Sequence, residues 1–326
     1  MKVLVSGGAG YIGSVTAELL LAEGHEVAVA DNLSRGHRDA VPEGAYFHEG
    51  DVRDLEAMEG LLRDRGIECV MHFCASSLVG ESMRNPGEYF GNNVIGVIRL
   101  LQAMEKTGVD RFIFSSTAAT YGEPEEVPIT EDAPVRPTNP YGESKATAER
   151  ILAWYEAIHG LRFAALRYFN AAGASRDHGE DHEPETHLIP LALEAAAGER
   201  DRLDIFGQDY PTPDGTCIRD YIHVLDLALA HILALDKLGE VEERVFNLGN
   251  GEGYSVREVI QSVERVTGRK VPTRDAPRRP GDPARLVASS ERARRVLGWK
   301  PQHAALDQIV GDAWAWKQRF PRGYEA

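Results

Sequence analysis

Cysteine, positive charge and long apolar runs are all scarce in this chain of 326 residues. Lys and Arg number 36 against 51 Asp and Glu, which leaves a formal net charge of −15. Such a charge argues against non-specific binding to nucleic acid or to an anionic membrane surface. No apolar run is long enough to cross a bilayer, and the first residues predict a core strand rather than a signal peptide. We therefore expect a cytoplasmic protein that binds neither nucleic acid nor membrane.

Only three cysteines occur, namely Cys69, Cys74 and Cys217. Three is an odd number, and no Cys-x-x-Cys spacing is present, so the sequence offers neither a disulfide framework nor a zinc site. We expect reduced thiols and no bound metal, which agrees with a cytoplasmic location.

A glycine-rich turn follows the first β-branched run of the chain. Residues 3–13 read Val-Leu-Val-Ser-Gly-Gly-Ala-Gly-Tyr-Ile-Gly, and a helical apolar pattern comes next. Gly7 suits a positive φ, Gly10 lets the backbone approach a pyrophosphate, and Gly13 allows close packing of helix on strand. The helix N-terminus then receives the anion. This strand–turn–helix context predicts a dinucleotide-binding site.

An acidic residue ends the second strand. Residues 26–30 read Glu-Val-Ala-Val-Ala and predict a strand, and Asp31 follows them, so a carboxylate is placed to accept the adenosine ribose hydroxyls. Because a carboxylate repels a 2′-phosphate, NAD is favoured over NADP as the cofactor. Arg35 weakens this preference slightly, since it could reach a phosphate.

Strand and helix patterns alternate over the first half of the chain, which is typical of an α/β fold with a doubly wound, Rossmann-like parallel sheet. From about residue 171, loops rich in Gly, Pro, Asp and His surround short helices and predict a smaller, interleaved C-terminal lobe. We assign 1–170 to the NAD-binding domain, with a returning segment near 222–250, and 171–326 to the smaller lobe. The predicted strands are 2–6, 26–30, 45–48, 69–73, 111–115, 162–168 and 245–248, and the predicted helices are 12–23, 54–65, 88–107 and 141–159.

Tyr141 and Lys145 stand four residues apart in a helical segment, so their side chains lie on one face. A tyrosine with its ordinary pKa of about 10 is a poor base at neutral pH. A neighbouring ammonium group favours the phenolate and lowers that pKa. The pair therefore predicts a proton-transfer device that acts on an alcohol, although an amphipathic helix with a packed Tyr and a solvated Lys has the same pattern.

Seven motifs in order make the chain similar to a known family. It resembles the extended short-chain dehydrogenase/reductases and, within them, the UDP-hexose 4-epimerases, from about residue 2 to residue 301. The motifs are Gly-Gly-Ala-Gly-Tyr-Ile-Gly (7–13), Gly-Asp-Val (50–52), Phe-Ser-Ser-Thr-Ala-Ala-Thr-Tyr-Gly (114–122), Tyr-Gly-Glu-Ser-Lys (141–145), Arg-Tyr-Phe-Asn-Ala-Ala-Gly (167–173), Arg-Asp-Tyr-Ile-His-Val (219–224) and Arg-Arg-Pro-Gly-Asp (278–282).

The resemblance implies an isomerase that interconverts UDP-galactose and UDP-glucose through a transient 4-keto sugar, with NAD retained as a bound cofactor. Tyr141 would take the proton of the sugar 4-hydroxyl. Thr117 would hydrogen-bond the reacting oxygen, and Lys145 would hold the nicotinamide ribose and lower the pKa of Tyr141. Arg219 and Arg279 would bind the substrate diphosphate.

The remaining implied ligands divide into two groups. Those for the cofactor are Gly7, Gly10, Tyr11, Ile12, Gly13, Asp31, Asn32, Asp51, Val52, Phe73, Ala75, Asn92, Ser115 and Phe169. Those for the UDP-sugar are Asn170, His187, Leu188, Phe206, Tyr221, Asp282 and Leu286.

Other chemistries on the same fold stay open. Ala118 and Ala119 stand where related dehydratases and decarboxylases carry acidic residues, which favours epimerisation, but a UDP-glucuronate 4-epimerase remains an alternative. A dehydrogenase that releases NADH and a non-catalytic dinucleotide sensor are the other candidates. Leu286 stands where narrow-specificity relatives often carry Tyr, which predicts a wider pocket that also admits UDP-N-acetylhexosamines.

Two further features receive interpretations. The segment 177–187 is rich in Asp, Glu and His, but its spacing fits no helical ligand pair, so we interpret it as a solvated acidic loop.

The resemblance also implies a homodimer whose interface is formed by the helices near 88–107 and 141–159. Apolar residues compatible with that interface, or equally with the core, are Val97, Leu101, Ile151 and Leu152.

Overall fold

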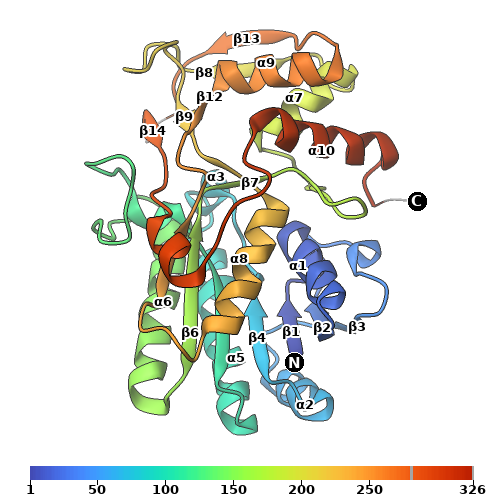
Figure 1. Ribbon diagram of the computed structural model, residues 1–326, viewed down its shortest axis with the longest axis vertical. Coiled ribbons are helices and arrows are strands. Elements are labelled where there is room, and N and C mark those ends of the chain that lie inside the picture. Colours follow the sequence, from blue (N-terminus) through green and yellow to red (C-terminus); the bar gives the residue numbers. More distant parts are fainter. Residues whose placement is uncertain (280–281, 325–326) are drawn as a thin grey trace.

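A sheet of seven parallel strands forms the centre of the molecule (Figure 1). The computed structural model describes residues 1–279 and 282–324. The strand order is β11-β6-β5-β4-β1-β2-β3, and every neighbouring pair runs parallel. The strands are β1 (Lys2–Ser6), β2 (Glu26–Asp31), β3 (Tyr46–Glu49), β4 (Cys69–His72), β5 (Arg111–Thr117), β6 (Arg162–Tyr168) and β11 (Val245–Leu248).

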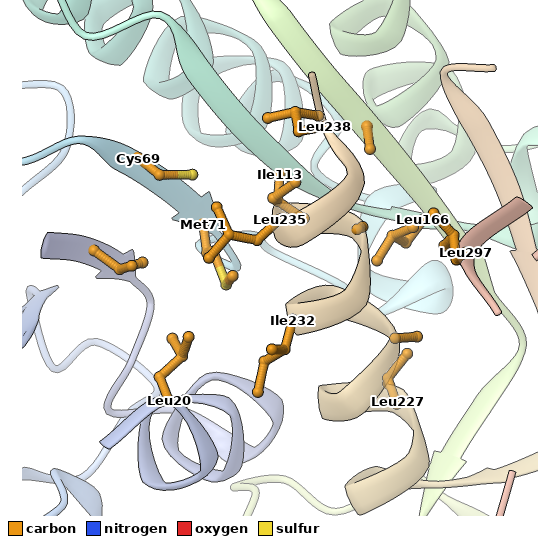
Figure 2. Close-up of a cluster of buried hydrophobic side chains, with 14 of the residues drawn as sticks. Leu20, Cys69, Met71, Ile113, Leu166, Leu227, Ile232, Leu235, Leu238 and Leu297 are labelled. Carbon is orange, nitrogen blue, oxygen red and sulfur yellow. The ribbon is translucent and has the colours of Figure 1, made fainter. Parts of the chain in front are cut away.

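Helices cover both faces of this sheet because its strands are apolar on both sides. One face packs against α1 (Tyr11–Ala22) and α8 (Val224–Lys237), and Figure 2 shows Leu20, Ile232 and Leu235 from these helices meeting Met71 and Ile113 of the strands. The other face packs against α2 (Leu55–Arg65), α5 (Ile95–Thr107) and α6 (Pro140–His159). The result is the predicted doubly wound α/β fold.

The strand order reverses direction at β1, which lies between β2 and β4. In open parallel sheets, ligands bind beyond the carboxyl ends of the strands at such a switch point. The turn after β1 leads directly into α1, so the glycine-rich segment lies at this point.

A second apolar cluster lies beyond the carboxyl ends of the strands, where Figure 1 shows α7, α9 and α10 gathered together. It contains residues of α7 (Leu188–Ala197), α9 (Val256–Thr267) and α10 (Leu306–Arg319), with strands that form small separate sheets. These strands are β7 (Asn170–Ala172), β8 (Leu203–Phe206), β9 (Ile218–Arg219), β10 (Tyr221–His223), β12 (Tyr254–Ser255), β13 (Thr273–Ala276) and β14 (Arg285–Leu286).

The predicted helix 88–107 is not a single α-helix. It consists of α4 (Pro86–Tyr89), the π-helical turn η2 (Phe90–Val94) and α5. Strand β11 joins the main sheet beside β6, where the sequence places a returning segment. The division of the chain at residue 170 stays a prediction.

The shorter helices complete the chain. They are α3 (Val79–Ser82), η1 (Arg38–Ala40), η3 (Ala118–Tyr121) and the π-helical η4 (Ala293–Leu297). Over the described ranges, no helix has the length and apolar character needed to cross a membrane. The three cysteines are free thiols.

Candidate active site

A cavity of about 330 Å³ opens at the carboxyl ends of the central strands. Every residue predicted to bind the cofactor lines it, as do Thr117, Asn170 and His187 from the predicted substrate set. The lining also includes residues that the sequence analysis did not select. Examples are Ser34, Leu78, Glu81, Tyr168, Glu180 and His182.

The glycine turn has the close packing that a dinucleotide requires. Gly7 has a φ of +80°, and a Cβ on it would lie 2.6 Å from the backbone nitrogen of Cys74. A Cβ on Gly13 would lie 2.2 Å from the carbonyl oxygen of Gly7. Gly10 begins α1 without a side-chain cap, so the first N–H groups of the helix can receive an anionic pyrophosphate.

Asp31 lies at the end of β2, where a ribose is expected. Its carboxylate accepts backbone N–H groups from Ala9 at 3.1 Å and Leu33 at 2.9 Å, and burial raises its pKa. The Arg35 guanidinium is engaged elsewhere, since it donates to the carbonyl oxygen of Glu183 at 2.5 Å and lies 3.5 Å from Glu81. An acidic group without a neighbouring free cation fits NAD better than NADP.

Further along the cavity wall, Asn32 and Asp51 form a polar edge. Asn32 Nδ2 donates to Asp51 Oδ2 at 3.2 Å. Arg53 binds the same carboxylate and lowers the pKa of Asp51 to about 2. These groups and the glycine turn show that the residues present fit a dinucleotide.

Tyr141 lies partly buried at the start of α6 and lines the cavity with Thr117 from the end of β5, whose hydroxyl lowers the pKa of Tyr141. Asn139 caps this helix by accepting the N–H of Gly142 at 2.9 Å, and a Cβ on Gly142 would lie 2.4 Å from Ala119 O. The glycine therefore lets the helix start pack against the turn that follows Thr117.

The side chains of the protein do not by themselves lower the pKa of Tyr141 as the sequence predicts. Burial raises the pKa of Tyr141, and the hydrogen bond from Thr117 opposes that rise only in part. The physical reason is that burial disfavours the phenolate, a cost that residue spacing does not reveal.

Lys145 is buried one turn further along α6. Its Nζ donates to the carbonyl oxygen of Ser115 at 2.8 Å and lies 4.8 Å from the centre of the Phe114 ring. Burial lowers the pKa of Lys145 to about 8. The ammonium group thus hydrogen-bonds the floor of the cavity at the end of β5.

Asn93 is a structural residue of this site that the sequence analysis missed. Its Nδ2 donates to Ser144 Oγ at 2.9 Å and to Ser76 O at 3.0 Å, while its Oδ1 accepts the N–H of Ser76 at 2.8 Å. Asn93 therefore ties the loop after β4 to the helix that carries Tyr141. It belongs to the π-helical turn η2, and such turns are frequent at functional sites.

Most of the predicted substrate residues lie outside the cavity lining. Arg219 forms an ion pair with Asp282, and the Arg279 guanidinium lies 4.1 Å from the centre of the Phe206 ring. Tyr221 is only 5% exposed and packs in the apolar cluster of the C-terminal helices. Leu188 begins α7, Leu286 pairs with Arg219 across β14 and β9, and Pro280 and Gly281 of the 278–282 motif lie outside the described residues.

The interpretation of 177–187 as a solvated acidic loop holds for only part of the segment, since Asp177, Glu183 and His187 are exposed but two of its carboxylates are not. The side chains of Glu180 and Glu185 are 7% and 9% exposed, and His178 and Gly179 are buried. The segment docks against α1, where His178 Nδ1 lies 2.8 Å from Glu18 Oε2. Tertiary contacts with residues far away in the sequence therefore remove these carboxylates from solvent.

Comparison with known proteins defines the class. Residues 3–249 match the NAD dependent epimerase/dehydratase family, and the chain belongs to this family. Its cofactor is NAD.

Individual relatives are more specific. The chain is 54% identical to the UDP-glucose 4-epimerase of Corynebacterium glutamicum over 97% of its own length and 95% of that protein. The UDP-glucose 4-epimerase of Brucella ovis, solved in complex with NAD, is 49% identical with a TM-score of 0.93, covering 96% of this chain and 97% of that one. The enzyme of Bifidobacterium longum, solved with NAD+ and UDP, is 39% identical with a TM-score of 0.93 over 99% and 100%.

Proposed function

We propose that this protein is an NAD-dependent 4-epimerase that converts UDP-galactose to UDP-glucose. The observation that carries this proposal is the pairing of Tyr141 with Thr117 inside the cavity that the glycine turn also lines. A tyrosine beside the expected nicotinamide can exchange a proton with a sugar hydroxyl, and the relatives act on nucleotide sugars.

Tyr141 is the group that takes the proton from the sugar 4-hydroxyl and returns it after the 4-keto sugar has turned over. Thr117 supports this transfer, because its hydroxyl donates to the phenolate and favours the basic form. Its own oxygen accepts the N–H of Ala119 at 3.1 Å, which fixes the direction of the side chain.

NAD bound in the cavity would supply reversible hydride transfer at sugar C4, and its oxidised ring would add a positive charge. Lys145 contributes a second positive charge at the floor of the same cavity. Since burial raises the pKa of Tyr141, positive charge near the phenol is required to make it a base at neutral pH. We therefore assign electrostatic support of Tyr141 to Lys145, together with a hydrogen bond to the cofactor ribose.

Substrate binding is assigned to the C-terminal lobe. Arg219 and Arg279 carry planar guanidinium groups suited to phosphate oxygens. Since Arg219 is paired with Asp282, a diphosphate must replace or share this carboxylate. We infer that Asn170, His187, Leu188, Phe206, Tyr221 and Leu286 contribute to the rest of the UDP-sugar site, and that the site also admits UDP-N-acetylhexosamines.

One experiment tests the activity. Purified protein is incubated with UDP-galactose and no added nicotinamide nucleotide, and we expect UDP-glucose to form. Persistence of the bound nucleotide through dialysis separates an epimerase from a dehydrogenase that releases NADH. Failure with UDP-galactose but turnover of UDP-galacturonate would replace the proposal with a uronate epimerase, and absence of both activities would refute it.

We also propose a cytoplasmic homodimer that forms through α5 and α6. Val97, Leu101 and Leu152, which the sequence makes compatible with an interface or with the core, are at most 1% exposed and belong to the core. Trp154 and Ile158, each 67% exposed, are instead the apolar side chains that α6 presents to solvent. We expect Trp154→Glu to shift the protein from dimer to monomer in analytical ultracentrifugation, whereas a wild-type monomer would contradict the interface.

A further inference from the structure

Four potential metal ligands converge on one wall of the cavity. Glu180, His182, Glu185 and His187 each direct a ligand atom into a group whose members all lie within 4.8 Å of one another. Three of them, Glu180, His182 and His187, also line the cavity. The segment is near the glycine turn, since the His182 ring lies edge-on to the Tyr11 ring at 6.3 Å.

The distances within this group lie on both sides of those in a metal coordination shell, and the Glu185–His187 contact is also a hydrogen bond. Glu180 Oε1 lies 3.2 Å from His182 Nδ1 and 2.8 Å from His187 Nδ1. Glu185 lies 3.8 Å from His182 Nδ1 through Oε2 and 2.9 Å from His187 Nδ1 through Oε1. Tetrahedral ligands about 2.0–2.1 Å from a zinc ion are about 3.3 Å apart, and the observed distances bracket this value.

One of the four potential ligand atoms has no hydrogen-bond partner among the described residues. His182 Nδ1 is a buried nitrogen that makes no hydrogen bond within the described residues, although it lies beside both carboxylates. A buried polar atom without a partner is rare in folded proteins. A metal ion bound by this nitrogen would satisfy it.

The charge of the group also calls for a cation. Both carboxylates are more than nine-tenths buried, and buried carboxylates are normally paired or bound to a metal. Without a metal, both carboxylates face His187, whose pKa they raise. A divalent ion would neutralise two carboxylates.

We propose that Glu180, His182, Glu185 and His187 form a binding site for one zinc-type divalent ion. Two imidazoles and two carboxylates suit zinc, which takes nitrogen and oxygen ligands in a tetrahedral arrangement. The ion has a structural role in this proposal, because it cross-links positions 180 and 187 and fixes the segment against the cavity wall. The site goes beyond the proposed epimerase activity, which needs no metal and in which His187 would contribute only its backbone to the UDP-sugar site.

The test uses the purified enzyme with its nucleotide. The protein is dialysed against a chelator, saturated with Zn²⁺, passed through a desalting column and analysed by elemental mass spectrometry. We expect one zinc per chain. X-ray absorption should give four nitrogen or oxygen ligands at about 2.0–2.1 Å, with imidazole among them.

Two variants and one control decide the assignment. Glu180→Gln and His182→Asn should each weaken zinc binding by at least about 100-fold, since even partners outside the coordination shell change affinity 10–100-fold. Glu183→Gln alters an exposed residue of the same segment and should retain one zinc per chain. Less than one zinc per chain in the wild-type protein would overturn the site. One zinc per chain in His182→Asn would do the same. The His182 side chain is partly exposed, so this variant disturbs folding less than Glu180→Gln does.

Discussion

The cofactor half of the cavity and the C-terminal lobe differ in how far their polar groups are committed to partners within the protein. In the cofactor half, the uncapped N-terminus of α1 is shaped for a ligand before one binds, and glycines keep side chains away. In the lobe, Arg219 already pairs with Asp282 and the Arg279 guanidinium packs on the Phe206 ring. A preorganised site holds its ligand more tightly for the same contacts, because less must be rearranged.

This difference agrees with the different roles of the cofactor and the substrate in an epimerase. The dinucleotide stays bound through many turnovers, whereas the UDP-sugar must leave after each one. A phosphate that binds Arg219 must replace the internal ion pair with Asp282. The loss of this ion pair offsets part of the binding energy and favours release of the UDP-sugar. Binding of the substrate and retention of the cofactor can therefore be altered separately by mutation.

The largest effect should come from Tyr141, the proposed base. Tyr141→Phe removes the only atom assigned to take the proton of the sugar hydroxyl, while the ring remains. General acid–base catalysis contributes about 10²–10⁴-fold, so we expect kcat to fall by about 10³-fold or more, with NAD still bound. Conversion of UDP-galactose to UDP-glucose measures kcat, and absorbance after denaturation measures the retained nucleotide.

A second tyrosine of the same helix supplies the control for that experiment. Tyr155 lies in α6 away from the cavity lining, so Tyr155→Phe should keep kcat within about twofold. Full activity of Tyr141→Phe would refute the assigned base. Loss of nucleotide from that variant would indicate that Tyr141 supports the cofactor half as well.

The next effect separates the two halves directly. Arg219→Ala removes the proposed charged hydrogen-bond donor to the diphosphate, a loss worth about 1.5–3 kcal/mol. We expect KM for UDP-galactose to rise about 10- to 100-fold, while the amount of bound NAD stays unchanged. Arg274→Ala is the matched control, because Arg274 is a half-exposed arginine of the same lobe that pairs with Asp204. A kcat effect without a KM effect would place Arg219 outside the substrate site.

Local spacing explains why the residues predicted to bind the cofactor all line one cavity, whereas most of those predicted to bind the substrate do not. The glycine turn, Asp31 and the Tyr141–Lys145 pair are all defined by residues close together in the chain. Arg219 and Asp282 are 63 positions apart, and their ion pair depends on how the strands of the lobe meet. No periodic pattern encodes such a contact.

Burial accounts for two departures from the sequence prediction. Desolvation raises the pKa of Tyr141, and part of the acidic segment is buried because it docks on α1 and the C-terminal region. Asn93 was missed for a related reason, since a π-helical turn interrupts the 3.6-residue period on which helix prediction depends.

The junction between the halves should respond to pH through His223. This buried ring caps α8 by accepting the N–H of Leu225 and contacts Asp312 of α10 at 3.2 Å. Burial, and then the nearby His303, lower the pKa of His223 to about 4, while Asp226 acts in the opposite direction. The unfolded chain binds this proton near pH 6.5, so the stability is present above that pH and is lost as the pH falls from 6.5 to 4.

His223→Asn tests this linkage and retains a side chain that can cap the helix. Between pH 7 and pH 5 the wild-type free energy of unfolding should fall by about 2 kcal/mol more than that of the variant. Urea titrations of both proteins at the two pH values measure the difference. Equal losses would mean that His223 does not link the halves through its protonation.

The smallest effect concerns the width of the sugar site in the lobe. Leu286→Tyr places a ring on β14 opposite Arg219, and one group in a pocket changes discrimination by about 1–3 kcal/mol. We expect the ratio of UDP-N-acetylglucosamine turnover to UDP-glucose turnover to fall about tenfold. UDP-glucose is the smaller substrate, so its own rate should stay within about twofold. Leu286→Ile conserves side-chain volume and should leave the ratio unchanged. An unchanged ratio in Leu286→Tyr would mean that the sugar does not reach this strand, and that the lobe selects its substrate through the diphosphate-binding arginines alone.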